Sequence, residues 1–119
     1  GSRIEKTKQE VCELISKLKD LLKISYIECA FLEIEIPPIP DAIVSCVDNG
    51  ADEIIILLNF LNAGRHVNTD IPRILNEARL KFPHVKIHMT KPVGQHERVL
   101  DVFSQMLIPY LNLPNDFRI

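Results

Sequence analysis

The 119-residue sequence has no tryptophan, few cysteines and no long apolar segment. No apolar run approaches the roughly 18 residues of a membrane-spanning helix, so we expect no membrane partner. The cysteines Cys12, Cys29 and Cys46 are odd in number and lack CxxC spacing, which argues against a disulfide framework and against a zinc knuckle. Free thiols suit a reducing compartment, and we therefore expect a soluble, cytoplasmic protein.

The sequence also lacks an excess of basic residues. Its 14 Lys and Arg are scattered among 16 Asp and Glu, and the formal net charge is -2. Nucleic-acid binding normally requires clustered Lys and Arg, so we expect no nucleic-acid partner. Neither a GxGxxG sequence nor a Walker A sequence is present, which argues against a nucleotide cofactor.

What remains is enough for one globular domain. Hydrophobic residues make up 46% of the chain, and a chain of this length supports one core. Four segments have the apolar spacing of amphipathic helices, namely residues 4–23, 41–49, 71–82 and 96–110. Gly50 follows the second as a natural C-cap. The last helix is expected to bury Val99, Leu100, Phe103, Met106 and Leu107.

Three segments are typical of β-strands. Residues 25–33, "SYIECAFLE", are rich in β-branched and aromatic types, and a proline-rich loop follows them. Residues 53–61, "EIIILLNFL", are apolar without alternation, which predicts a strand covered on both faces. Residues 84–90, "HVKIHMT", alternate, which predicts an edge strand that buries Val85, Ile87 and Met89.

The alternation of helices and strands predicts an α/β fold with right-handed crossovers. The first helix has no strand before it, whereas one further strand would complete a four-stranded, doubly wound unit. We therefore expect a three-layer α/β/α, flavodoxin-like unit with a parallel sheet that lacks its first strand.

Polar residues follow each predicted strand. Ligands of such sheets bind beyond the carboxyl ends of the strands, where Glu33, His66 and the segment 91–96 meet. A carboxylate and an imidazole suit a divalent transition metal. They would equally suit proton abstraction, because an imidazole titrates near neutral pH. Spacing alone leaves both roles open, and a solvated loop histidine or strand end is the alternative for each residue.

The stretches "ECAFLEIEIPPIPDAI", "VDNGADEIIILLNFLNAGRHVNTDIPRILNEAR" and "KPVGQHERVLDVF" follow one another in this order. Together they resemble the class II chelatases of the sirohydrochlorin cobaltochelatase and ferrochelatase type (CbiX/SirB-like). The resemblance implies insertion of cobalt, iron or sometimes nickel into sirohydrochlorin. The divalent metal would be a substrate, and no nucleotide would be consumed.

The resemblance also implies roles for individual residues. The family's catalytic and metal-binding histidine falls on His66, and its glutamate ligand falls on Glu33. A second family histidine precedes Gly-Ser-Arg, and this chain opens with Gly1-Ser2-Arg3, so that histidine is absent from it.

Four further residues are candidate substrate contacts. Gly64 would allow close approach of the macrocycle. Arg65 and Lys91 would pair with the carboxylates of sirohydrochlorin. His96 could reach the same site, although a residue at a helix start is more often a cap.

We expect residues 1–111 to form the chelatase domain, and residues 112–119 to be a tail, a linker or the start of a second repeat. The unit would work as a homodimer or as one half of a two-repeat chain. Two alternatives remain open at this point. One is a non-catalytic tetrapyrrole or metal carrier without the first histidine, and the other is a flavodoxin-like interaction domain with an incidental His66.

Overall fold

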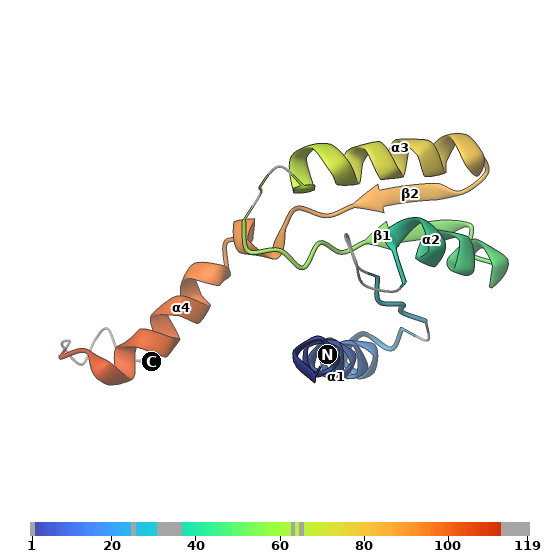
Figure 1. The fold of residues 1–119 in the computed structure, drawn as a ribbon. Coiled ribbons are helices and arrows are strands. Elements are labelled where there is room, and N and C mark those ends of the chain that lie inside the picture. Colours follow the sequence, from blue (N-terminus) through green and yellow to red (C-terminus); the bar gives the residue numbers. More distant parts are fainter. Residues whose placement is uncertain (1, 25, 31–36, 63, 65, 113–119) are drawn as a thin grey trace. The chain divides into compact units, whose positions relative to one another are not determined.

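The computed structural model describes residues 2–24, 26–30, 37–62, 64 and 66–112 (Figure 1). The chain divides into two compact units, Gly1–Asp52 and Glu53–Ile119. None of the helices in the described ranges is long and apolar enough to cross a membrane.

The first unit contains the helices α1 (Ser2–Leu22) and α2 (Ile39–Asp48). The helix predicted at residues 4–23 is confirmed by α1, whose apolar stripe is only half covered, with Leu14 and Leu21 exposed. Lys23 adopts a positive φ of 58°, and the Ile24 N–H donates to the Lys19 carbonyl at 3.2 Å. This left-handed residue ends the helix.

Helix α2 begins at Ile39, two residues before the predicted start. Pro40 fits into its first turn because the N–H that proline lacks has no intrahelical acceptor there. At the other end Gly50 has φ 93°, its N–H donates to the Val47 carbonyl, and the Ala51 N–H donates to the Cys46 carbonyl. These two bonds form a Schellman motif, which confirms the predicted glycine stop.

The strand predicted at residues 25–33 is wrong for residues 26–30, which have irregular backbone and lie outside the sheet. Residues 31–36 lie outside the described part of the chain. A strand requires a hydrogen-bonded neighbour, which residue propensity alone does not supply. The segment instead contacts α2 through its side chains: Asn49 Nδ2 donates to the Tyr26 hydroxyl at 3.2 Å, and the Cys46 thiol donates to Glu28 Oε2 at 3.4 Å.

The second unit is built on a parallel pair of strands, β1 (Glu53–Ile56) and β2 (Lys86–Met89), joined through helix α3 (Ile71–Lys81). Both predicted strands are confirmed in place, but their hydrogen-bonded cores are shorter. Figure 1 shows α3 running alongside β2. Arg79 links α3 to β2, because its Nη2 donates to the Ile87 carbonyl at 2.7 Å.

One face of this sheet carries the core of the unit. Ile54 and Ile87 are register partners and both are buried, as are Ile71, Leu75 and Ala78 on α3. The opposite face is open: Ile55 is 66% exposed, and beside it His88 Nε2 lies 2.6 Å from Glu53 Oε2. The expectation that residues 53–61 are covered on both faces is therefore wrong for Ile55.

Met89 is also more exposed than predicted, at 40%. It follows Ile87 on the same face, but it lies at the carboxyl end of β2 and borders a pocket. The exposure of Met89 therefore follows from its place beside the pocket.

The segment predicted as a helix at residues 96–110 contains α4 (Val99–Leu107) and then the turn η3 (Ile108–Tyr110), and a short turn, η2 (Val93–Gln95), precedes it. Its expected burial is wrong for Leu100, Phe103, Met106 and Leu107, all of which are exposed, while Val99 is half-buried. Helix α4 packs mainly against the adjacent turns η2 and η3. An apolar stripe predicts a helix, but it does not supply the surface that covers it.

Candidate functional site at the carboxyl ends of the strands

Backbone pairing continues beyond the ends of β1 and β2. The Thr90 N–H donates to the Ile56 carbonyl, the Val93 N–H to the Leu58 carbonyl and the Gly94 N–H to the Phe60 carbonyl, at 2.9, 3.1 and 3.1 Å. The two segments that leave the sheet therefore stay side by side for several residues.

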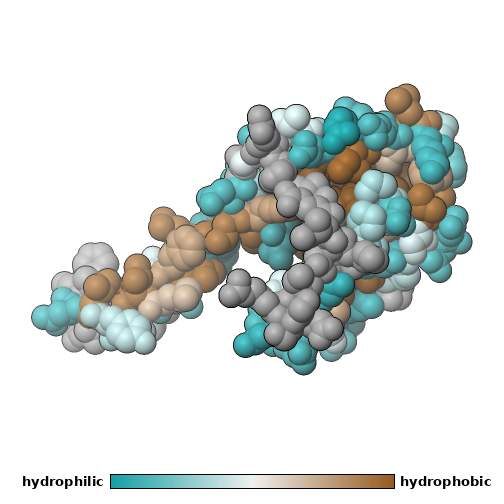
Figure 2. Space-filling view, in the orientation of Figure 1, coloured by the Kyte–Doolittle hydropathy of each residue, from teal (hydrophilic) through white to brown (hydrophobic). Residues whose placement is uncertain are grey.

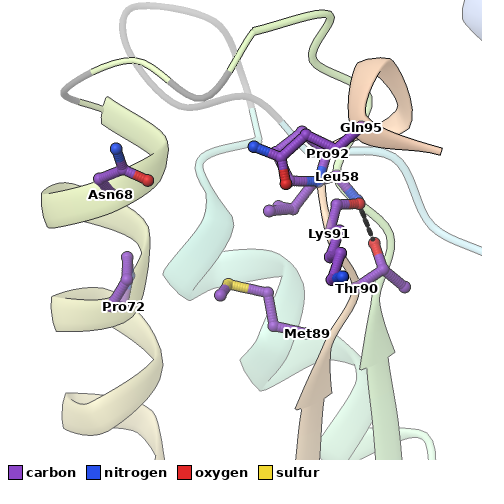
Figure 3. A pocket seen from close by; sticks show the side chains of 8 residues that line it. All are labelled: Leu58, Asn68, Pro72, Met89, Thr90, Lys91, Pro92 and Gln95. Carbon is purple, nitrogen blue, oxygen red and sulfur yellow. Dashed lines mark hydrogen bonds between the residues drawn. The ribbon is translucent and has the colours of Figure 1, made fainter.

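A pocket of about 260 Å³ lies where these segments meet the start of α3. Figure 3 shows side chains from the α3 side facing side chains from the end of β2 across this space. The apolar lining is Leu58, Pro72, Met89 and Pro92, and the polar lining is Asn68, Thr90, Lys91 and Gln95. An apolar wall with a few polar groups is typical of a small-molecule site.

The turn that leads into α3 forms one side of this site. It is a π-helical turn, η1, over His66–Asp70, and the Asn68 N–H donates to the Gly64 carbonyl at 3.0 Å. π-helical turns are rare in proteins, and those that occur are often found at functional sites. Pro72 then occupies the first turn of α3.

The predicted site residues differ in how far the structure describes them. Glu33 and Arg65 lie outside the described residues, and His66 is described in its backbone alone, as the first residue of η1. The predicted convergence of Glu33 and His66 therefore stays a prediction. Within the described residues no group of three His, Cys, Asp or Glu side chains could hold a metal.

The other three predicted contacts are described. Lys91 lines the pocket. Gly64 is exposed, and a Cβ added there would meet no atom within 4 Å. His96 is exposed, and its Nδ1 accepts a hydrogen bond from the Arg98 N–H at 3.0 Å. The bond lies in the turn before α4, and the cap residue of the helix, Arg98, makes no side-chain capping bond.

Two polar residues of the pocket, Asn68 and Thr90, were not predicted, and Gln95 was predicted only as part of the segment 91–96. Gln95 stands in the quoted stretch "KPVGQHERVLDVF", directly after Gly94, and this glycine was the available signal. Asn68 and Thr90 carry no signal in the sequence. The Thr90 hydroxyl bonds to Leu58, 32 residues away along the chain, and Asn68 lines a pocket whose other wall is the segment that follows β2.

Comparisons of the chain with a family model and with curated proteins agree on one family. The family model described as CbiX matches residues 1–109. The chain is 32% identical over 107 residues to the chloroplastic sirohydrochlorin ferrochelatase of Arabidopsis thaliana, covering 90% of this chain and 48% of that protein. It is 31% identical over 105 residues to the sirohydrochlorin cobaltochelatase of Sulfolobus acidocaldarius, covering 88% and 81%.

A solved structure agrees with these relatives. SirB from Bacillus subtilis with Fe³⁺ superposes with a TM-score of 0.74 at 30% identity, covering 96% of this chain and 45% of that one. The chain spans about half the length, or less, of the first curated relatives that it matches. Its α/β fold is that of the CbiX and SirB chelatases, and the chain belongs to the CbiX family.

Proposed function

We propose that this protein inserts a divalent metal, cobalt or iron, into sirohydrochlorin. The observation that carries the proposal is the family match over residues 1–109, whose relatives include both a ferrochelatase and a cobaltochelatase of sirohydrochlorin. Nickel is a third candidate, because sites with nitrogen and oxygen ligands accept several of these metals. The metal is a substrate in this reaction, and no nucleotide is needed.

The pocket supports the proposal by its place and its lining. It lies beyond the carboxyl ends of two parallel strands, where ligands of open α/β sheets bind. Its 260 Å³ is below the roughly 300–1,000 Å³ of pockets for drug-sized ligands. The pocket therefore suits one edge of a macrocycle, with the remainder of the ring outside it.

His66 is the residue that we propose for metal binding and proton transfer, with Glu33 as a second metal ligand. Two pyrrole nitrogens lose their protons as the divalent metal takes their place, so the reaction needs a proton acceptor beside the ring. A neutral imidazole can accept one of these protons. The position of His66 supports this role, because it opens the turn η1 that also carries the pocket residue Asn68.

Substrate contacts are proposed at Gly64, Arg65, Lys91 and His96. Lys91 has the strongest support, because it lines the pocket and carries a positive charge. Gly64 leaves open space where a side chain would stand. His96 accepts a hydrogen bond from the Arg98 N–H before α4 and does not line the pocket, so we rank it lowest.

We further propose that residues 1–111 are the chelatase domain and that it works in the cytoplasm, as a homodimer or as one half of a two-repeat chain. The relatives support both arrangements. This chain covers 48% of the protein from Arabidopsis but 81% of the one from Sulfolobus. Residues 112–119 would then be a tail, a linker or the start of the next repeat.

The test is metallation of sirohydrochlorin by the natural full-length protein, followed by absorbance with Co²⁺ or Fe²⁺. A parent protein that does not exceed the spontaneous rate overturns the proposed function. We expect His66→Ala to lose about 10²- to 10⁴-fold in rate, the usual contribution of a general base. The matched control is His84→Ala, an exposed histidine before β2, which should keep the parent rate.

Two further outcomes bear on the residue assignment. If His66→Ala metallates as fast as the parent, then His66 has no catalytic role. Because both metal binding and proton acceptance need an unprotonated imidazole, the parent rate should also fall in acid.

A further inference from the structure

The backbone of the turn η2 packs tightly against the segment that follows β1. The N–H groups of Val93 and Gly94 donate to the carbonyls of Leu58 and Phe60, each at 3.1 Å. A Cβ on Gly94 would lie 1.6 Å from the Leu61 carbonyl oxygen. No side chain fits at this position, so the close contact requires glycine.

Thr90 links the same two segments by hydrogen bonds, close to the ends of the strands. Its Oγ1 accepts a hydrogen bond from the Leu58 N–H at 3.1 Å and donates to the Lys91 carbonyl at 2.9 Å. One hydroxyl therefore joins the exit of β1 to the exit of β2. We name Thr90, Gly94 and their partners Leu58 and Phe60 the strand-exit latch.

The strand-exit latch determines where Gln95 stands. The η2 turn closes with the Gln95 N–H donating to the Pro92 carbonyl at 2.9 Å. In Figure 3 the Gln95 side chain extends from this turn toward the α3 side of the pocket, where Asn68 and Pro72 lie. The amide can donate two hydrogen bonds without any charge of its own, and Lys91 on the same segment adds a positive charge.

We propose that Gln95 and Lys91 bind one carboxylate arm of the tetrapyrrole in this pocket, and that Thr90 and Gly94 are positioning residues that hold Gln95 in place. The inference rests on the proposed function and deepens it. An ammonium and a neutral amide form a pair of donors for a carboxylate, while Leu58, Met89 and the two prolines offer an apolar wall to the adjoining ring edge.

The first experiment places a negative charge where the carboxylate arm would bind. Gln95→Glu in the natural full-length protein should weaken sirohydrochlorin binding about tenfold or more, in line with the loss of a hydrogen bond to a charged group. The dissociation constant is measured by absorbance titration without metal. Metallation kinetics should show a raised KM with kcat unchanged, because the arm is remote from the pyrrole nitrogens.

Gln105→Glu is the matched control, since it makes the same change on the exposed surface of α4 and should bind like the parent. Parent-like affinity in Gln95→Glu overturns the inference and leaves the proposed function standing. If neither the parent nor Gln105→Glu binds sirohydrochlorin, both the proposed function and the inference are overturned.

The second experiment tests positioning. Thr90→Val removes both hydroxyl bonds and should weaken binding to the level of Gln95→Ala, whereas Thr90→Ser keeps the hydroxyl and should restore the parent affinity. The double variant Thr90→Val with Gln95→Ala should bind no more weakly than Gln95→Ala alone, because Thr90 acts through Gln95. Losses that add in the double variant would show that Thr90 does not act in this way.

Discussion

Among the residues that the structure describes, Cys46 is the one whose protonation the fold alters most clearly. Burial raises its pKa, and the hydrogen bond to Glu28 raises it further, to about 11. Burial alone would raise the pKa of the Glu28 carboxyl as well, but hydrogen bonds from Tyr26, Ser45 and Cys46 outweigh burial and lower it. The pair is therefore a neutral thiol beside an ionised carboxylate.

We predict that Cys46 resists alkylation. With a pKa of about 11, only about one thousandth of the thiol is ionised at pH 8, and the thiolate is the reactive form. The exposed Cys12 should react first with iodoacetamide, as followed by peptide mass spectrometry. Glu28→Gln should speed the labelling of Cys46, and Glu97→Gln on the exposed surface should not. Equal rates at Cys46 and Cys12 would contradict the prediction.

The raised pKa of Cys46 also makes the stability of the fold depend on pH in a defined direction. The folded state holds the Cys46 proton more tightly than the unfolded chain does, so its contribution to folding is complete below the ordinary pKa of 9.0. That contribution is lost as the pH rises from there toward about 11.

Single residues of the candidate site could be predicted where their chemistry is visible in the sequence. Lys91 was predicted as a substrate contact because it follows a strand and is charged, and it lines the pocket. Gln95 was predicted only as part of the segment 91–96 and not singled out, because its place depends on the contact of Gly94 with Leu61. The assignments of His66 and Glu33 stay predictions.

The end of α2 shows how a secondary-structure element is terminated by one residue. Gly50 has a φ of 93°, a conformation that costs an L-residue with a Cβ roughly 1–2 kcal/mol. We predict that Gly50→Ala lowers the free energy of unfolding by about 1 kcal/mol, measured by urea denaturation. Gly64→Ala is the matched control, since Gly64 lacks a positive φ and has open space around its Cα. Equal stability of the parent and Gly50→Ala would count against the left-handed cap.

The helices were predictable because their periodicity is local. The bounds of α1 and α3 follow from apolar residues three and four positions apart, and those of α3 also from Pro72 in its first turn and Pro83 after its end. The bounds of the strands were less predictable: β1 spans Glu53–Ile56 rather than residues 53–61. A strand lasts only as long as its ladder stays regular, and beyond Ile56 the bonds from the neighbouring segment, some 30 residues further along the chain, lose their regular spacing.

At the scale of the whole molecule, the buried core and the apolar stripe of α4 are separate features. The side chains of Ile71 and Leu75 are at most 1% exposed, whereas Leu100 on α4 is 71% exposed. Figure 2 shows hydrophobic side chains gathered along the surface of α4. In this structure, therefore, α3 and not α4 supplies the apolar side chains of the core.

We predict that Leu75→Ala destabilises the 119-residue chain by about 2–5 kcal/mol, the usual cost of a cavity in a core. Leu100→Ala should change stability by less than about 0.5 kcal/mol, as exposed substitutions usually do. Urea denaturation measures both variants against the parent. A loss at Leu100 as large as that at Leu75 would mean that α4 is packed on a core in solution.

The sequence by itself determined the fold class, the order of the helices and the family, because periodicity, turn residues and motifs are written in neighbouring positions. It also named His66 and Glu33 as candidates. Only the tertiary structure decided the register of β1 on β2, the strand-exit latch, the pocket and the exposure of α4. Each of these depends on atoms that are far apart along the chain, so no local pattern could specify them.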